Sequence, residues 1–167
     1  MYLLSRNRLT KLTEYLLPLA GVFLLQFFLA ELLSIQTVRP DFLLIYVLYI
    51  SIRRGSFVGV ITGFILGMLA DFAGVGSYFG LSSIVYVITG YLTGYLKGQY
   101  SRMIPFYFHL IWIGILLFSF FIFAYVRYQF LFVTDLPVFW GKWFLTAGYT
   151  FGFLGILQLV IPLKRVG

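Results

Sequence analysis

Long apolar segments follow one another along almost the whole chain, and they constrain its fold more than any other feature. A helix that crosses a membrane needs about 20 apolar residues to span about 30 Å of hydrocarbon. The sequence contains five such segments and one shorter one, at about 15–34, 41–52 (the short one), 56–72, 79–96, 104–125 and 143–163. They lack strict apolar–polar alternation, which favours helices over strands. The sequence predicts an all-α polytopic membrane bundle of about six transmembrane helices, one integral membrane domain over residues 1–167.

The composition excludes most other classes of protein. Hydrophobic residues make up 62% of the 167 residues and charged residues only 10%, whereas a soluble domain carries about 45–50% and about 25%. Such a chain lacks the polar surface that a water-soluble enzyme needs. The absence of cysteine excludes disulfides and thiolate metal sites.

The distribution of basic residues predicts the orientation. The short segment 41–52 is either a re-entrant half-helix or a full crossing. If it crosses the membrane, nine of the 12 Lys and Arg residues share one side, and only Arg39, Arg127 and Lys142 face the other. Cytoplasmic loops carry the excess of basic residues. This favours six crossings with both termini in the cytoplasm, and it explains the basic balance without binding to nucleic acid. Aromatic residues typical of membrane interfaces flank two segments: Tyr78, Phe79, Trp140 and Trp143.

Small residues recur on one face of three segments. Residues four apart share a helix face, and glycines have this spacing at Gly59, Gly63 and Gly67, at Gly90 and Gly94, and at Gly148 and Gly152. Such stripes let helix backbones approach closely in lipid. They indicate either packing among these three helices or a docking groove for the helix of another protein. Four threonines beside the stripes are expected to donate hydrogen bonds to their own helices: Thr89, Thr93, Thr146 and Thr150.

Asp71 continues the first stripe and is the only carboxylate within the later segments. A charged group inside a bilayer is costly unless it is paired or hydrated. Three interpretations are open. The carboxylate binds backbone N–H groups of the 74–80 turn or Ser77, it pairs with Arg39 or Arg127, or it belongs to a ligand or ion site.

A second polar group, Arg39-Pro40-Asp41, precedes the short segment. Proline disfavours helix at the residue before it, and aspartate is a strong helix N-cap. These residues therefore predict a capped start for the short helix, with Arg39 able to form an ion pair nearby. Arg53, Arg54 and Gly55 predict its end, because basic residues suit a helix C-terminus and glycine commonly follows it.

The sequence holds few groups for catalysis. It has no Walker-type loop, no His-Glu-x-x-His, no Gly-x-Ser-x-Gly, five carboxylates and one histidine. His109 is expected to be an interfacial or packed side chain, because no second His or Cys could share a metal with it. No enzyme, metal or cofactor is therefore expected.

Several blocks together resemble the family of the bacterial rod shape-determining protein MreD. They are Arg-Pro-Asp-Phe-Leu-Leu (39–44), Arg-Arg-Gly (53–55), Gly-x3-Gly-x3-Gly-x3-Asp (59–71), Gly-Val-Gly-Ser-Tyr-Phe-Gly-Leu (74–81) and Gly-Tyr-Leu-Thr-Gly (90–94). The length and hydropathy are similar along the whole chain, whereas the motifs lie within residues 39–98. On this resemblance, Pro40-Asp41 and the helix of Gly59, Gly63, Gly67 and Asp71 are the best candidates for family-specific structure.

The resemblance implies a non-enzymatic component of the bacterial inner membrane, in the machinery that builds lateral peptidoglycan and sets cell shape. Its partners would be MreC, which has one transmembrane helix, and the elongation proteins MreB, RodA and a class B penicillin-binding protein. It also implies a fold like the substrate-binding subunits of energy-coupling-factor transporters. A vitamin-type substrate-binding subunit of a transporter is the alternative function, with Glu31, Arg39, Asp41 and Asp71 as its pocket. An intramembrane enzyme is a third class, and it would need another acid or histidine beside Asp71.

Overall fold

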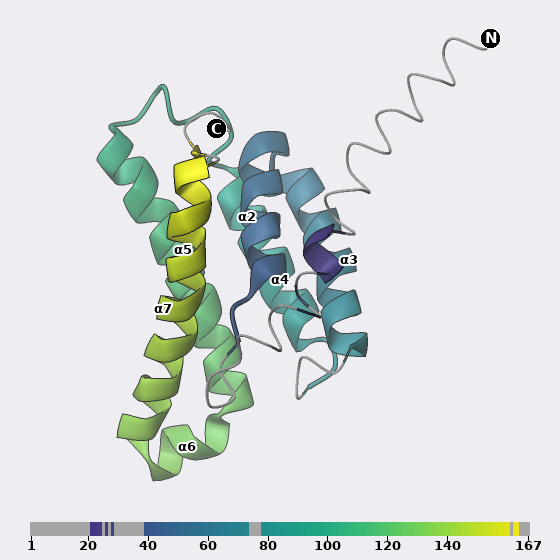
Figure 1. Ribbon diagram of the computed structural model, residues 1–167, viewed down its shortest axis with the longest axis vertical. Coiled ribbons are helices and arrows are strands. Elements are labelled where there is room, and N and C mark those ends of the chain that lie inside the picture. The colour runs from purple at the N-terminus through teal and green to yellow at the C-terminus, as the bar shows by residue number, and fades with distance from the viewer. Residues whose placement is uncertain are drawn as a thin grey trace, which may run out of the picture.

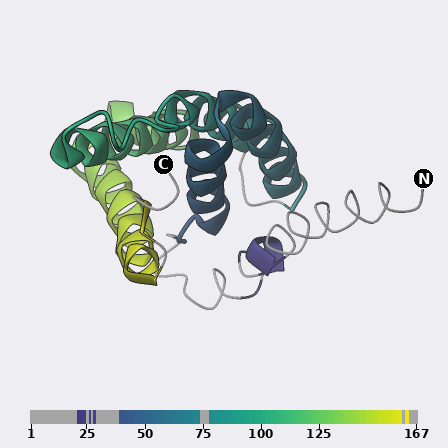
Figure 2. The same cartoon turned by 90° about the horizontal axis from the view of Figure 1, so that it is seen from above.

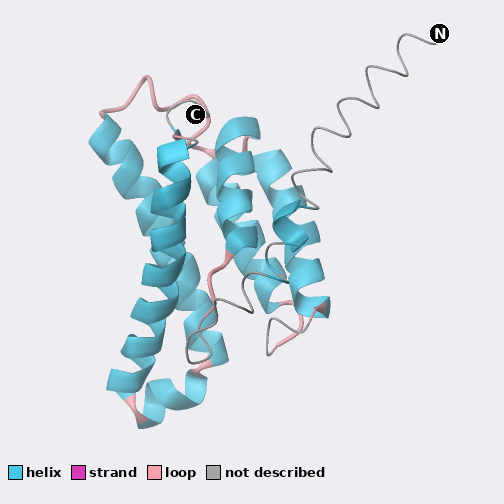
Figure 3. Ribbon diagram, in the orientation of Figure 1, coloured by secondary structure: helices cyan, strands magenta, loops and turns pink. Residues whose placement is uncertain are grey.

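The described part of the chain is helical throughout (Figures 1 and 3). The computed structural model describes residues 21–24, 26, 28, 39–73, 78–160 and 162–163, and no strand occurs among them. Six helices have defined bounds: α2 Phe42–Arg54, α3 Ser56–Phe72, α4 Leu81–Gly94, α5 Pro105–Arg127, α6 Gln129–Thr134 and α7 Leu136–Val160. The all-α prediction is confirmed for these residues.

Successive long helices run in opposite directions, so the connections between them lie at the two ends of the bundle (Figure 1). These two ends differ in their side chains. The basic end holds Arg53 and Arg54 at the end of α2, Lys97 after α4 and Arg102 before α5, all of them exposed. There the Lys97 Nζ donates to the Arg54 carbonyl oxygen at 3.1 Å, which ties the end of α4 to the end of α2. The opposite end, which we call the aromatic end, holds α6 and the adjoining ends of α5 and α7.

Helix α2 lies in the middle of the bundle, with α3, α4, α5 and α7 around it (Figure 2). It begins where Asp41 Oδ1 accepts from the Leu44 N–H at 2.9 Å, an N-cap of the predicted kind. It ends with two arginines and with Gly55, whose φ of 97° is strained for any residue with a Cβ. The predicted start and end of the short helix are therefore confirmed.

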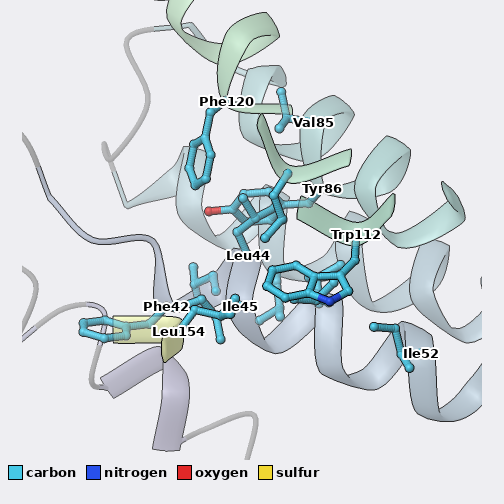
Figure 4. Packing of buried hydrophobic residues seen from close by; sticks show 14 of the residues in the cluster. Phe42, Leu44, Ile45, Ile52, Val85, Tyr86, Trp112, Phe120 and Leu154 are labelled. Carbon is cyan, nitrogen blue, oxygen red and sulfur yellow. The ribbon is translucent and has the colours of Figure 1, made fainter. Parts of the chain in front are cut away.

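The core forms around α2 because nearly every face of this helix is buried. Leu43, Val47, Leu48 and Ile52 are completely inaccessible. Around them pack side chains from α3, α4, α5 and α7, including Leu66, Val85, Tyr86, Trp112, Leu116, Phe120 and Leu154 (Figure 4). A helix that is apolar on all sides is expected at the centre of such a bundle.

The helices follow the predicted segments with three differences. The predicted segment 15–34 lies mostly outside the described residues, although 21–24, 26 and 28 are helical. Helix α7 begins at Leu136, seven residues before the predicted segment 143–163. The short helix α6 was not predicted at all, because its six residues are too few to show a helical period.

One described helix is long and apolar enough by itself to cross a membrane. It is α5, with 23 residues and a mean hydropathy of 2.2 in its most apolar stretch. Only 28% of that stretch is buried, so α5 is unlike the central helix of a soluble protein. Helices α3 and α4 are apolar but shorter.

Candidate functional site

The glycine stripes of α3 and α4 lie against each other. A Cβ built on Gly59 would lie within 3.0 Å of the Gly90 backbone, and one built on Gly63 within 3.0 Å of the Tyr86 backbone. At one end of the stripe Gly67 meets the backbone of Ser83, and at the other Gly94 meets the backbone of Ser56 and Gly55. The two helices touch backbone to backbone over their whole shared length. These stripes are therefore taken up inside the chain, and they offer no groove to another protein.

The glycines of α7 are placed differently. A Cβ built on Gly148 or Gly152 would have no atom within 4 Å, and the same holds for Gly141 and Gly155. All four are exposed. They share one side of α7 with Leu145, Ile156 and Leu159, which are 58%, 63% and 86% exposed. We call these seven residues the outward face of α7.

The carboxylate of Asp71 caps helix α4 from the end of α3. Its Oδ2 accepts from the Gly80 N–H at 3.0 Å, the Ser83 N–H at 3.2 Å and the Ser83 hydroxyl at 3.0 Å. Its Oδ1 accepts from the Ser82 N–H at 3.1 Å. These amides belong to the first turn of α4, which has no partner for them within its own helix. The carboxylate thus joins α3 to α4 at the end of the glycine stripe.

This geometry decides among the interpretations of Asp71. Both of its oxygens are engaged by α4, and the side chain is only 7% exposed. The capping interpretation is correct in kind, but only Gly80 belongs to the turn that we expected. The other donors, Ser82 and Ser83, lie in the following helix, and Ser77 is outside the described residues. An arginine is not what satisfies this carboxylate.

Asp41 is the centre of a second polar cluster, in which four helices meet. The Tyr86 hydroxyl of α4 donates to its carboxylate, at 2.7 Å from Oδ1 and 2.9 Å from Oδ2. The Asp41 N–H donates to Thr150 Oγ1 of α7 at 3.2 Å. Gln26 joins from the first helical segment: its Nε2 donates to the Pro40 carbonyl at 3.2 Å, and its Oε1 accepts from the Phe42 N–H at 2.8 Å.

The cluster satisfies a stretch of backbone that is not helical. Residues 39–41 lie outside the helices, so the Pro40 carbonyl and the Asp41 N–H have no helical partner, whereas the Asp41 carbonyl accepts from the Ile45 N–H at 3.3 Å. Non-helical backbone at membrane depth requires such partners from the surrounding protein. Pro40 is buried, whereas Arg39 is exposed. The structure therefore brings Pro40 and Asp41 into one site and leaves Arg39 at its edge.

Removing the Tyr86 hydroxyl should loosen this cluster. We expect Tyr86→Phe to lower the free energy of unfolding by about 1–3 kcal/mol, because a partly buried carboxylate loses its side-chain donor. The measurement is thermal unfolding of the purified protein. In a chain of this size, each kcal/mol lost lowers the midpoint temperature by about 2–4 °C. Tyr91→Phe is the matched control, since among the described residues the Tyr91 hydroxyl bonds the exposed Tyr95 hydroxyl alone. Equal midpoints for the two variants would contradict the role of Tyr86.

Three side chains of these clusters, and the Ser82 N–H, were missed from the sequence. Gln26 carried a usable signal, because it is a lone amide within an apolar segment and must find a partner there. Tyr86 and Ser83 carried none, because a tyrosine or serine in an apolar helix is common. The four predicted threonine bonds are confirmed: Thr89, Thr93, Thr146 and Thr150 each donate to the carbonyl four residues earlier.

The single histidine of the chain has a structural partner. His109 Nδ1 accepts from the Trp112 indole N–H at 3.0 Å, and its ring packs edge-on against Tyr100 and Phe108. The packed histidine that we predicted is confirmed. Among the described residues, no group of three His, Asp or Glu side chains could hold a metal ion.

The aromatic end carries a continuous cluster of rings. Phe121, Tyr125, Phe132, Phe139 and Trp140 contact one another across α5, α6 and α7. Two cations lie over Tyr128 beside them, Lys142 Nζ at 4.8 Å and the Arg127 guanidinium at 5.7 Å from the ring centroid. Such a mixture of rings and cations is typical of a membrane–water interface.

The comparison with protein families identifies the chain. The model of the rod shape-determining protein MreD matches residues 10–163, which include the α3–α4 pair, both aspartate clusters and α7. No curated protein and no solved structure matches, so the expected likeness to energy-coupling-factor subunits stays a prediction. The family match covers nearly all of the 167 residues. The chain is a member of the MreD family of rod shape-determining proteins.

Proposed function

We propose that this chain is a multi-pass, non-catalytic scaffold of the bacterial inner membrane that binds the transmembrane helix of MreC. Membership in the MreD family makes it a membrane protein with a role in rod-shape determination. In the proposed complex it holds MreC beside MreB, RodA and a class B penicillin-binding protein, and so supports lateral peptidoglycan synthesis. The scaffold needs no chemistry of its own, and both described aspartate clusters are engaged in holding helices together.

The charges of the described helices support an orientation. Four exposed cations gather at the basic end, whereas Arg127 and Lys142 lie at the aromatic end. Basic residues are enriched on the cytoplasmic side. We place the basic end in the cytoplasm and the aromatic end at the outer interface, with both termini cytoplasmic.

The outward face of α7 is the observation that carries the proposal. Helices associate in lipid where small residues allow backbones to approach, since apolar side chains gain little by leaving lipid for one another. The stripes on α3 and α4 are already occupied by each other, whereas Gly148 and Gly152 have open space before them. A single transmembrane helix could lie along this face with its backbone close to that of α7.

Filling the outward face with side chains should therefore release MreC. We expect the double variant Gly148→Leu/Gly152→Leu to lower the MreC recovered with the tagged protein by about tenfold or more, because a loss of about 1.4 kcal/mol suffices for that change. The measurement is co-purification from co-expressing cells in mild detergent. The folded protein should be unaffected, since the built Cβ atoms meet nothing.

Gly114→Leu is the matched control. Gly114 is also exposed with open space around it, but it lies on α5 between the exposed side chains of Leu110 and Phe118. Recovery of MreC at the control level with the double variant would exclude the outward face as its site. Failure of the unaltered protein to retain MreC would overturn the scaffold itself, and a retained vitamin or an ATPase module would favour the transporter alternative.

A further inference from the structure

The helices exposed to lipid differ in length, and this difference has a consequence for the membrane if the proposed multi-pass arrangement holds. Helix α5 has 23 residues and α7 has 25, about 34 and 37 Å. Helix α3 has only 17 residues, about 25 Å. Its exposed apolar side chains run from Phe57 (79% exposed) to Phe72 (71% exposed), a length of about 22 Å.

Helix α3 is shorter than α5 and α7, and the missing length lies at one end of the bundle. At the basic end, the bond from Lys97 to Arg54 holds the end of α4 level with the end of α2, and α3 begins two residues after that end. At the other end, the α5–α6–α7 hairpin extends well beyond α3 and α4 (Figure 1). Since the basic end is proposed to be cytoplasmic, α3 and α4 stop short of the outer interface.

The α5–α7 side and the α3–α4 side of the bundle therefore fit bilayers of different thickness. On α5, the exposed stretch from Ile104 to Tyr125 covers about 31 Å, close to the full hydrocarbon thickness of about 30 Å. On the α3 side, about 8 Å of hydrocarbon has no protein surface to match it. A short hydrophobic surface is accommodated by local thinning of the bilayer, at a modest cost for each ångström.

The polar groups at the end of α3 favour thinning. Asp71 and the first turn of α4 lie at this end, together with Tyr78 and the edge-on pair of Phe72 and Phe79, whose centroids are 5.1 Å apart. Tyr78 and Phe79 are 53% and 67% exposed. Tyrosine is enriched at headgroup level, and a carboxylate is costly within hydrocarbon.

We propose that the outer leaflet is depressed along the α3–α4 side, so that headgroups and water reach the level of Phe72, Tyr78 and the Asp71 cap. The surface of α3 and α4 binds lipid, and it imposes on that lipid a thickness smaller by about 9 Å than the α5 surface does. The bilayer around the protein is then asymmetric, with its thin sector on the side of the glycine-packed pair.

Nitroxide labels on single cysteines can measure this depth, because the natural chain has no cysteine. The full-length protein is reconstituted in dioleoyl phosphatidylcholine–phosphatidylglycerol vesicles with one label at Phe72→Cys, Phe64→Cys, Phe118→Cys or Tyr125→Cys. Phe72 is the last residue of α3, about 24 Å from its start, and on α5 the two control positions lie about 20 and 30 Å from the start. Relative exposure to oxygen and to a water-soluble nickel chelate gives the depth of each label.

The expected reading places the Phe72 label at or above the level of the Tyr125 label, while the Phe64 and Phe118 labels lie deep in the hydrocarbon. In dimyristoyl vesicles the thinner bilayer already fits α3, so the outer leaflet should be depressed less. The Phe72 label should then move deeper relative to the Tyr125 label. A Phe72 depth between those of Phe118 and Tyr125 would mean a flat leaflet and would overturn the depression alone. A Phe72 label that protein shields from both reagents would also overturn the depression alone. Nickel access at Phe64 and Phe118 would overturn the multi-pass arrangement and the depression together.

Discussion

Gly63→Ala is expected to lower the free energy of unfolding by about 3 kcal/mol, the upper part of the usual range for overpacking. The added Cβ would lie within 3.0 Å of the carbonyl oxygen and carbon of Tyr86. Both are backbone atoms of a buried helix, so neither can move aside as a flexible side chain could. In a chain of this size, the thermal midpoint in detergent should fall by roughly 6–12 °C. Gly63→Leu should leave little monodisperse protein on size exclusion.

Gly152→Ala and Gly152→Leu are the controls for this result. They make the same changes on an apolar helix, where the Cβ meets open space. Because alanine favours helix over glycine by about 1 kcal/mol, the controls should be unchanged or slightly more stable. A Gly63→Ala midpoint equal to that of Gly152→Ala would show that the α3–α4 pair is not packed as closely as described.

Asp71→Ala is expected to have the second large effect, a loss of about 4 kcal/mol. The change leaves the amides of Gly80, Ser82 and Ser83 without their acceptor at a site that is 7% exposed. Each buried donor left unsatisfied costs about 1–3 kcal/mol, and partial access of water lowers the sum. Asp71→Asn should lose about half as much, because one oxygen remains as an acceptor while the new amide group faces donors.

Asp135→Ala gives the comparison for a cap that is not buried. At the start of α7, Asp135 Oδ1 accepts from the exposed Val138 N–H at 3.2 Å. Loss of such a cap costs about 0.5–2 kcal/mol. The measurement is thermal unfolding of both variants in one detergent. If Asp71→Ala is no worse than Asp135→Ala, then the carboxylate does not hold α3 to α4.

Together these results would separate stability from function along the glycine stripes. Substitutions on the α3–α4 pair act on folding, so they should reduce MreC recovery only in proportion to the folded protein that remains. Substitutions on the outward face of α7 should leave the amount of folded protein unchanged and lower the MreC recovered with it. Rod shape in cells would fail in both cases, which is why protein amount and MreC recovery must be measured along with cell shape.

Much of the local structure could be predicted from residue patterns. The apolar segments specify helices, because a backbone in lipid must satisfy its own hydrogen bonds. Asp41 and Gly55 bound the short helix through local chemistry that needs no distant partner. The four-residue spacing of Gly59, Gly63 and Gly67 places them on one helix face, whatever surrounds the helix.

Only the tertiary structure decided what each of these faces meets. The helical period aligns residues on a face but does not name the opposing helix, and apolar side chains are as well solvated by lipid as by one another. Hydropathy therefore could not tell the occupied stripe of α3 from the open one of α7. The donors that meet Asp71, and the Gln26, Tyr86 and Thr150 side chains around Pro40 and Asp41, come from helices that only the fold brings together.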